Sequence, residues 1–272
     1  MEEYISDNSL YIRSKNNSMI NRKMIGRVLG MLLFIELGMF LLCAGVSAGY
    51  GESDYKYFLY TCIINAVVGG LLLLYGRGAE NKMSRRDGYC VVTLSWVFFT
   101  FFGMLPFYFS GSIDTITNAF FETMSGFTTT GATILDDIES LSHGMLFWRS
   151  LTQWIGGLGI VFFTIAILPI FTTGGVQLFS AESTGVTHDR THPKINVMAK
   201  WLWTIYLVLT VSETVLLMFG GMSLFDAICQ SFATTATGGY STKQNSISYW
   251  NSPYIEYVVA ISMIVSSINF SL

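Results

Sequence analysis

The fold of this 272-residue chain is decided by two short stretches, Thr128-Thr129-Thr130-Gly131-Ala132 and Ala236-Thr237-Gly238-Gly239-Tyr240. Each stretch follows an apolar segment that is too brief to cross a bilayer, and each lies between two long apolar segments. Extended backbone rich in threonine and glycine, re-entering a membrane from one side, can present carbonyl oxygens to a dehydrated cation. The two stretches are therefore candidate ion-coordinating loops.

The composition is that of a protein that crosses a membrane several times. Hydrophobic residues make up 51% of the chain and charged residues only 12%, whereas soluble domains carry about 25% charged residues. Six segments are apolar and long enough to be candidate spans: 25–49, 57–76, 89–110, 148–171, 198–220 and 253–272. The sequence thus predicts an all-α polytopic membrane protein with six spans and two re-entrant loops.

Basic residues are concentrated on alternate connections between the predicted spans. They precede or begin the first span, lie between the second and third spans, and lie between the fourth and fifth. These residues are Arg13, Lys15, Arg22, Lys23, Arg27, Arg77, Lys82, Arg85, Arg86, Arg190 and Lys194. Because cytoplasmic connections carry an excess of lysine and arginine, we expect the N-terminus and these connections to face the cytoplasm.

The second candidate loop repeats the first. Shifting the sequence numbers by 108 pairs Thr129 with Thr237 and Gly131 with Gly239, whereas shifting them by 107 pairs Thr130 with Thr237. We favour the shift of 108, and the register stays open by one position. A repeated unit of helix, loop and helix is consistent with a pore built by pseudo-symmetry.

The segments before the loops, 116–126 and 224–233, are predicted to be short re-entrant helices. Helix-start residues precede them, Ser112 or Asp114 in the first unit and Ser223 in the second. The C-terminus of such a helix carries about half a negative charge and would point toward a cation at the loop. The alternative is two extracellular loops rich in threonine and glycine, and the recurrence of the pattern favours the filter.

Two charged residues are candidate supports of the first loop. Glu122 lies within the first short helix, where it either supports the filter through hydrogen bonds or lies near the headgroups. Arg149, at the outer end of the fourth span, either pairs with an acidic residue of the preceding connection or anchors the helix at the interface. The acidic residues considered are Asp136, Asp137 and Glu139. Both alternatives stay open.

The glutamates within the spans, the histidines of the linker and the glycines of the fourth span are predicted to have structural roles. Glu36 and Glu213, within the first and fifth spans, are predicted to be partnered structural residues rather than cation ligands. His188 and His192 favour a solvated linker over a metal pair. The glycines of the fourth span are predicted to allow close helix approach. Since no catalytic or phosphate-binding motif occurs, we expect no enzymatic activity and no cofactor.

Several motifs resemble those of a known family. Residues 120–133 (FFETMSGFTTTGAT) are similar to the first pore loop of TrkH-type subunits, which belong to the Trk/Ktr/HKT superfamily of bacterial and plant potassium transporters. Residues 147–160 (FWRSLTQWIGGLGI) resemble the helix that follows that loop. Residues 237–242 resemble the second pore loop, and 268–270 a motif of the last helix. The resemblance covers most of the chain from about residue 25.

The resemblance implies a leading helix pair and four helix–pore-loop–helix repeats around one potassium pathway. This chain would hold about half of that pore and is expected to be a fragment. The predicted parts are a cytoplasmic N-terminal segment (1–24), the leading helix pair (25–76), the first pore repeat (89–171), a cytoplasmic linker (172–197) and a second pore repeat, truncated at its end (198–272).

The resemblance also implies a site, partners and a location. Potassium would be coordinated by the filter residues Thr128, Thr129, Thr130, Gly131, Ala132, Thr237, Gly238, Gly239 and Tyr240. The protein would be a homodimer in the lipid of the bacterial cytoplasmic membrane, with a nucleotide-binding cytosolic regulator of the TrkA type and no nucleic-acid partner. The alternatives are a sodium-permeable or non-selective cation channel or symporter of the same fold, and a non-conducting structural fragment.

Overall fold

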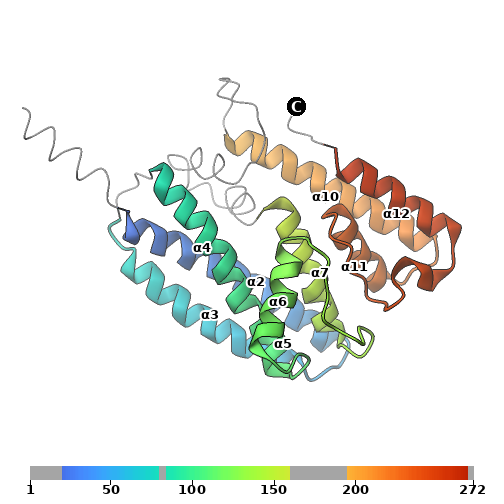
Figure 1. Cartoon of the computed structure of the whole chain (residues 1–272), viewed down its shortest axis with the longest axis horizontal. Helices are drawn as coiled ribbons and strands as arrows, with labels where there is room; N and C mark the ends of the chain where they lie inside the picture. Colours follow the sequence, from blue (N-terminus) through green and yellow to red (C-terminus); the bar gives the residue numbers. More distant parts are fainter. Residues whose placement is uncertain (1–19, 80–83, 160–194, 269–272) are drawn as a thin grey trace, which may run out of the picture.

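The structure is a computed structural model that describes residues 20–79, 84–159 and 195–268 (Figure 1). The regular secondary structure of these residues is helical, so the predicted all-α class is confirmed. In chain order the helices are α2 (Arg22–Gly49), α3 (Tyr55–Tyr75), α4 (Arg85–Gly103), α5 (Leu105–Ser110), α6 (Ile116–Phe127), α7 (His143–Leu158), α10 (Ile195–Phe219), α11 (Leu224–Thr235), the 3-10 helix η2 (Ser246–Trp250) and α12 (Pro253–Ser266).

Four helices among the described residues are long and apolar enough to cross a membrane. They are Arg22–Gly49, Tyr55–Tyr75, Arg86–Ser110 and Trp201–Phe219, and each overlaps a predicted span. Helix α12 is also apolar but is shorter. The second half of the predicted span 148–171 and most of the linker 172–197, including His188 and His192, lie outside the described residues.

The candidate span Arg86–Ser110, which covers the predicted span 89–110, is interrupted at Met104 and so is made of two helical segments. Helix α4 ends at Gly103, and α5 begins at Leu105 with Pro106 in its first turn. A proline inside a helix lacks the backbone N–H, and its ring clashes with the carbonyl group one turn earlier. The interruption therefore follows from Pro106.

Buried aromatic side chains join the first two helices to the unit that carries the first loop. Trp148 of α7 is fully buried, and its ring centroid lies 4.6 Å from that of Phe40 in α2. Its indole N–H donates to the carbonyl oxygen of Gly103 at 2.8 Å. The ring of Phe127, the last residue of α6, meets the same tryptophan edge-on at 6.0 Å. The first loop thus starts from a helix end that is fixed by packing.

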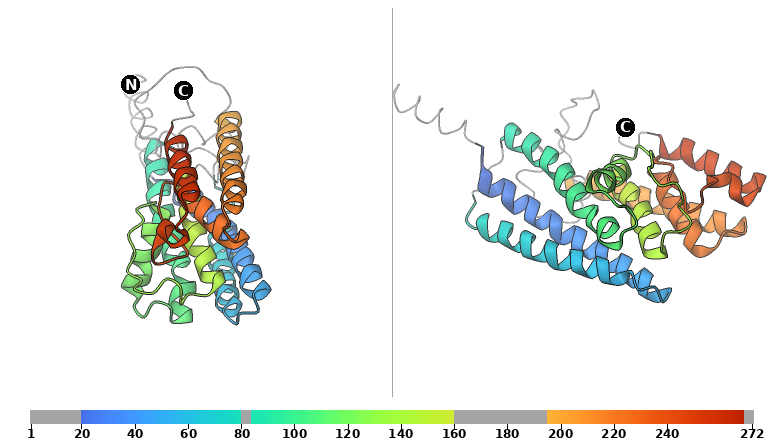
Figure 2. Two further views of the ribbon diagram at one scale, coloured as in Figure 1. Left: turned by 90° about the vertical axis from the view of Figure 1, so that its right-hand side faces the viewer. Right: turned by 60° about the horizontal axis from the view of Figure 1, so that its bottom comes forward.

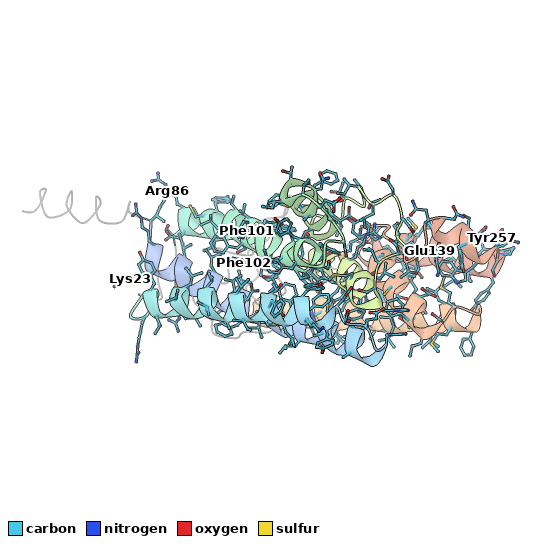
Figure 3. All side chains as sticks on the ribbon, turned by 90° about the horizontal axis from the view of Figure 1, so that it is seen from below. Lys23, Arg86, Phe101, Phe102, Glu139 and Tyr257 are labelled. Atoms are coloured by element: carbon cyan, nitrogen blue, oxygen red, sulfur yellow. The ribbon has the colours of Figure 1, made fainter. Side chains whose placement is uncertain are left out.

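Helix α2 packs against α3, α4 and α7, and α11 packs against α7 and α10. The right-hand view of Figure 2 shows α2 and α3 on one side, α10 and α12 on the other, and α6 and α7 between them. In Figure 3, Lys23 and Arg86 lie at one end of the molecule, whereas Glu139 and Tyr257 lie toward the other. The basic residues at the starts of α2 and α4 are therefore far from the acidic segment that follows the first loop.

Glycines allow α2 and α3 to approach closely. A Cβ atom added to Gly30 would lie 2.8 Å from the carbonyl oxygen of Gly69 and 3.1 Å from the backbone nitrogen of Leu73. A Cβ atom on Gly69 would in turn lie 3.2 Å from the carbonyl oxygen of Gly30. A Cβ atom on Gly38 of the same helix α2 would meet no atom within 4 Å. Small residues at the contact let the two backbones touch.

We expect Gly30→Ala to destabilise the α2–α3 hairpin by ~1–3 kcal/mol, because the added methyl group forces the two backbones apart. The matched change Gly38→Ala places its methyl group in open space, and the higher helix propensity of alanine should leave stability equal or slightly greater. Thermal unfolding of the detergent-purified variants, followed by tryptophan fluorescence, compares the two. Equal midpoints would contradict the close approach.

Candidate functional site

The two candidate loops share one backbone conformation. Thr129 and Thr237 both have left-handed φ angles, of 52° and 55°, and Gly131 and Gly239 follow with φ angles of 74° and 82°. Both pairs are related by the shift of 108 in sequence number. The short helices before the loops, Ile116–Phe127 and Leu224–Thr235, are related by the same shift. The structure therefore supports the register of 108 over that of 107.

The hydrogen bonds that close the two helices onto their loops also match. Thr130 N–H donates to the carbonyl of Ser125 at 2.9 Å, and Gly238 N–H donates to that of Ala233 at the same distance. Each bond joins a loop residue to the last turn of the helix before it. The two loops therefore leave their helices in the same way.

The starts of the two short helices differ in part from the prediction. Ser223 caps α11 as expected, but Thr115, rather than Ser112 or Asp114, caps α6. The Ser112 hydroxyl is engaged instead with Ser110 at 2.8 Å, in the turn between α5 and α6. The prediction of the first cap was wrong because a serine near a helix start can also bond within the preceding turn.

Both loops place a threonine in a conformation that threonine rarely adopts. A β-branched residue with positive φ is an outlier, because its side chain crowds the backbone. Such a conformation costs ~1–3 kcal/mol and persists only where the surroundings impose it, most often at binding sites. The strain occurs at Thr129 and again at Thr237. Its recurrence at the constant shift of 108 shows that the surroundings impose the same backbone path on both loops.

The two loops lie directly against each other. A Cβ atom on Gly131 would overlap the carbonyl oxygen of Gly238, so that only glycine fits there. The hydroxyl group of Tyr240 donates to the carbonyl oxygens of Ala132, at 3.2 Å, and of Glu122, at 2.9 Å. The structure therefore brings the two sets of predicted filter residues together, although they are far apart in the sequence.

The predicted filter residues differ in exposure. Thr128, Thr130, Ala132, Thr237 and Gly239 are exposed, and Thr129 and Gly131 are partly so. Gly238 and Tyr240 are buried, so the tyrosine side chain is a link within the protein and does not face solvent.

A buried ion pair stands behind the loops. Arg149 Nε lies 2.8 Å from Glu122 Oε1, with side chains that are 3% and 0% exposed. Glu122 also accepts hydrogen bonds from the Thr133 hydroxyl at 2.9 Å and from the backbone N–H of Ile134 at 3.0 Å. The carboxylate thus holds the segment that leaves the first loop.

Arg149 joins this pair to the second loop. Its Nη1 donates to the carbonyl oxygen of Ser241 at 2.9 Å, and its guanidinium carbon lies 3.7 Å from the centroid of the Tyr240 ring. The guanidinium group therefore contacts both loops, one through Glu122 and the other directly.

The partners of Arg149 expected from the sequence were wrong. The side chains of Asp136, Asp137 and Glu139 are exposed, whereas Arg149 points inward from α7. A buried charge needs a buried partner, and Glu122 is the carboxylate that meets this condition.

Gln153 is a further residue that contacts the second loop and that the sequence analysis did not single out. It lies on α7 four residues after Arg149, and its Oε1 accepts the backbone N–H of Tyr240 at 3.1 Å. A Cβ atom on Gly238 would overlap this glutamine. The spacing in the sequence could have indicated it, because a residue four positions after Arg149 lies on the same face of the helix.

The helix α7 also carries glycines that meet the filter helices. A Cβ atom on Gly156 would overlap the carbonyl oxygen of Phe127, and one on Gly157 would lie 2.8 Å from the Cα atom of Ala236. Phe127 ends α6, and Ala236 follows α11. The predicted packing role of these glycines is confirmed, and α7 touches the end of both short helices.

The start of α7 is anchored at the connection between α2 and α3. Glu52 accepts the backbone N–H groups of His143 and Gly144, at 2.9 and 3.3 Å, and its Oε1 lies 2.7 Å from Nδ1 of His143. Tyr50 stacks on the histidine ring with centroids 3.9 Å apart. Ser142 caps the same helix end. These contacts explain why α7 begins earlier than the predicted residue 148.

Comparison with known proteins relates the chain to membrane transporters. A family model described as a cation transport protein, TrkH, matches residues 55–272. The chain is 42% identical over 250 residues to the Trk system potassium uptake protein TrkH of Escherichia coli (strain K12), covering 91% of this chain and 52% of that protein. It is 31% identical over 252 residues to the Trk system potassium uptake protein TrkG of the same strain, covering 92% and 52%.

A solved structure agrees with these matches. The crystal structure of the potassium transporter TrkH from Vibrio parahaemolyticus superimposes with a TM-score of 0.78 at 34% sequence identity. The match covers 93% of this chain and 51% of that chain. The chain therefore spans about half the length of the curated relatives that it matches.

We expect Glu122→Gln to destabilise the protein by ~3–5 kcal/mol, because it leaves the buried guanidinium group of Arg149 without a counter-charge. The control is Lys243→Gln, which removes an ion pair with Glu139 of 3.5 Å whose side chains are 22% and 42% exposed. An exposed pair contributes only ~0–1 kcal/mol. Denaturant unfolding in detergent measures both changes. Equal losses would contradict the central role of the buried pair.

The Glu52 carboxylate, which anchors the start of α7, should make the stability of the protein depend on pH in the acidic range. Partial burial disfavours the Glu52 carboxylate, but hydrogen bonds from His143 and Gly144 outweigh this effect and lower its pKa. Its contribution to stability is therefore fully present above the unfolded pKa of ~4.3 and is lost as the pH falls through the lower folded pKa. We expect Glu52→Gln to be less stable than the wild type at neutral pH and to lose less on acidification.

Thermal midpoints at neutral pH and in strong acid, below the unfolded pKa of Glu52, measure this difference. The matched control is Glu256→Gln, since Glu256 is an exposed carboxylate on α12, and it should keep the acid dependence of the wild type. If Glu52→Gln loses as much stability on acidification as the wild type does, then Glu52 is not the group that anchors α7.

Proposed function

Because the chain belongs to the TrkH family of cation transport proteins, which are transporters and not enzymes, we propose that it forms part of a potassium uptake pathway in the bacterial cytoplasmic membrane. The relatives described above are named as potassium uptake proteins. The observation that carries the proposal is the pair of matching loops, in which a strained threonine and a left-handed glycine recur at one constant shift.

In the proposed mechanism, a potassium ion loses part of its water shell and is coordinated by backbone carbonyl oxygens of the two loops. These loops are Thr128 to Ala132 and Thr237 to Tyr240. Carbonyl oxygens replace the hydration shell of the ion. The C-terminal ends of α6 and α11 add about half a negative charge each at the start of the loops.

Two loops alone do not surround an ion. We propose that this chain supplies about half of the coordinating ring and that matching loops supply the remainder. The relatives support this proposal, since they are about twice as long as the chain. The domain arrangement that follows is the one predicted from the sequence, with the leading helix pair at 25–76, the first pore repeat at 89–171 and the second at 198–272.

The pair formed by Glu122 and Arg149 acts in this proposal as a filter support and not as an ion ligand. Both side chains are buried, and their hydrogen bonds reach the residues that follow each loop, Ile134 and Ser241. An ion can leave as well as enter when several oxygen atoms each bind it weakly. Carbonyl oxygens of the two loops can bind an ion in this way only if the distance between the loops is fixed. In this proposal the ion pair fixes that distance.

The proposal also covers the orientation of the chain, argued from its basic residues, and its partners, argued from the family. We propose that the N-terminus faces the cytoplasm, since Lys23 and Arg86 lie at the end of the bundle opposite to Glu139 (Figure 3) and cytoplasmic ends are rich in basic residues. A homodimer and a cytosolic nucleotide-binding regulator of the TrkA type are the partners that we propose. A sodium-permeable or non-selective cation pathway of the same fold, and a non-conducting structural role, are the alternatives that the experiment separates.

The proposal is tested by rubidium uptake in bacterial cells that lack their own potassium uptake systems. The cells express the complete reading frame that contains this chain, together with its cytosolic regulator. We expect Gly131→Ala to reduce uptake by about tenfold or more, because its methyl group costs ~1–3 kcal/mol where it meets the carbonyl oxygen of Gly238.

The matched control is Gly111→Ala. Gly111 has nearly the same left-handed φ angle, 72°, but a Cβ atom there would meet nothing within 4 Å. We expect uptake to remain near the wild-type level. Failure of the inserted wild-type protein to take up rubidium would overturn the transport proposal. Equal competition by sodium and potassium would favour the non-selective alternative.

A further inference from the structure

A second carboxyl group lies behind the second loop, and the filter support described above does not use it. Glu213, on α10, is only 2% exposed. Its Oε2 accepts a hydrogen bond from the hydroxyl group of Thr235 at 3.4 Å. Thr235 is the last residue of α11, and Ala236 alone separates it from the loop residues Thr237 to Tyr240. The carboxyl group is therefore bonded to a residue two positions before the backbone that is proposed to hold the ion.

Glu213 has no cationic partner among the described residues. The ion pairs found there join other side chains, and Oε1 of Glu213 has no hydrogen-bond partner in the same ranges. The elements packed against α10 are α7, α11 and α12, and no hydrogen bond or ion pair found there joins their charged or titratable side chains to Glu213. These side chains are His143, Arg149, Asp226, Cys229, Tyr254, Glu256 and Tyr257.

The adjacent helix α11 also carries two buried oxygen atoms without a partner in the part of the chain that the structure describes. The Oε1 atom of Gln230 and the hydroxyl oxygen of Ser231 are buried and lack a hydrogen-bond partner among the described residues. Ser231 lies one turn before Thr235 and thus on the same side of the helix. A buried carboxyl group that has no lysine or arginine bonded to it among the described residues can take up a proton or attract a cation.

A related carboxyl group lies behind the short helix of the first pore repeat, although it belongs to the leading helix pair. Glu36 of α2 is fully buried, with one oxygen hydrogen-bonded to Asn65 at 3.0 Å and the other without a partner in the described ranges. Its free oxygen lies beside Gly103, next to Thr123 and Phe127 of α6. The same shift that aligns the two loops places Phe127 at Thr235. Each short helix is therefore backed by a buried carboxyl group.

A buried carboxylate without a counter-charge is costly, so it takes up a proton or remains charged only when a cation is near. We propose that Glu213 binds a proton in competition with the potassium ion held by the second loop. The inference rests on the proposed function, because the ion in the loop supplies the counter-charge of the ionised form. Linkage then requires that protonation of Glu213 weaken cation binding and that cation binding release the proton.

Rubidium uptake as a function of concentration and pH tests this inference in the complete reading frame. In the wild type we expect the KM for rubidium to rise by about tenfold on acidification, because the attraction of one buried charge is lost. Glu213→Gln, which mimics the protonated carboxyl group, should have the raised KM at every pH. Glu256→Gln, the same change at an exposed carboxylate of α12, should keep the KM and pH dependence of the wild type.

The outcomes separate this inference from the proposed function. Uptake by the wild type together with an unchanged KM in Glu213→Gln would overturn the inference, since the carboxyl group would then be a neutral hydrogen-bonding group, and would leave the transport proposal intact. Absence of uptake by the inserted wild type would overturn the transport proposal itself.

A second measurement covers the case in which Glu213→Gln fails to insert. Potassium titrations of the purified wild-type protein, read as thermal stabilisation, give its potassium affinity at acidic and neutral pH. A lower affinity at acidic pH supports the competition. An affinity that does not change with pH would overturn it.

Discussion

The buried ion pair between Glu122 and Arg149 is the constraint on which the rest of the site depends. Two charges without water require each other, since removing either one leaves an uncompensated charge in a low-dielectric interior. The hydrogen bonds of this pair reach the residues that follow the two loops, Ile134 after the first and Ser241 after the second. The pair therefore ties together two segments that are far apart in the chain.

The loops themselves are held in a conformation that their residues do not prefer. Thr129 and Thr237 are strained, and Gly131 is pressed against the carbonyl oxygen of Gly238. Such backbone survives only where the surroundings over-determine it. Those surroundings are provided by α7, which touches the ends of both short helices with its glycines and holds Tyr240 through Gln153. Helix α7 thus packs against both loops.

Much of this arrangement was predictable from the sequence. Four of the six predicted spans overlap helices that are long and apolar enough to cross a membrane, and the matching backbone of the two loops recurs at the constant shift read from the sequence. The interruption at Pro106 was missed, and one expected span became α4 and α5. The partner of Arg149 was also missed, because acidic residues near it in the sequence were more obvious than Glu122, which lies 27 residues earlier.

The sequence by itself determined the class of the protein, the membrane helices that overlap its apolar segments, and the positions of the two loops, because these depend on local composition and periodicity. Only the tertiary structure decided the register of 108, the contact between Gly131 and Gly238, and the lack of a cationic partner for Glu213 among the described residues. These features depend on which faces of distant helices meet. The hydrophobic pattern of a segment specifies that it forms a helix that crosses the membrane. The buried polar groups on facing helices specify the rotation of that helix about its own axis, and hence which of its faces meets its neighbours.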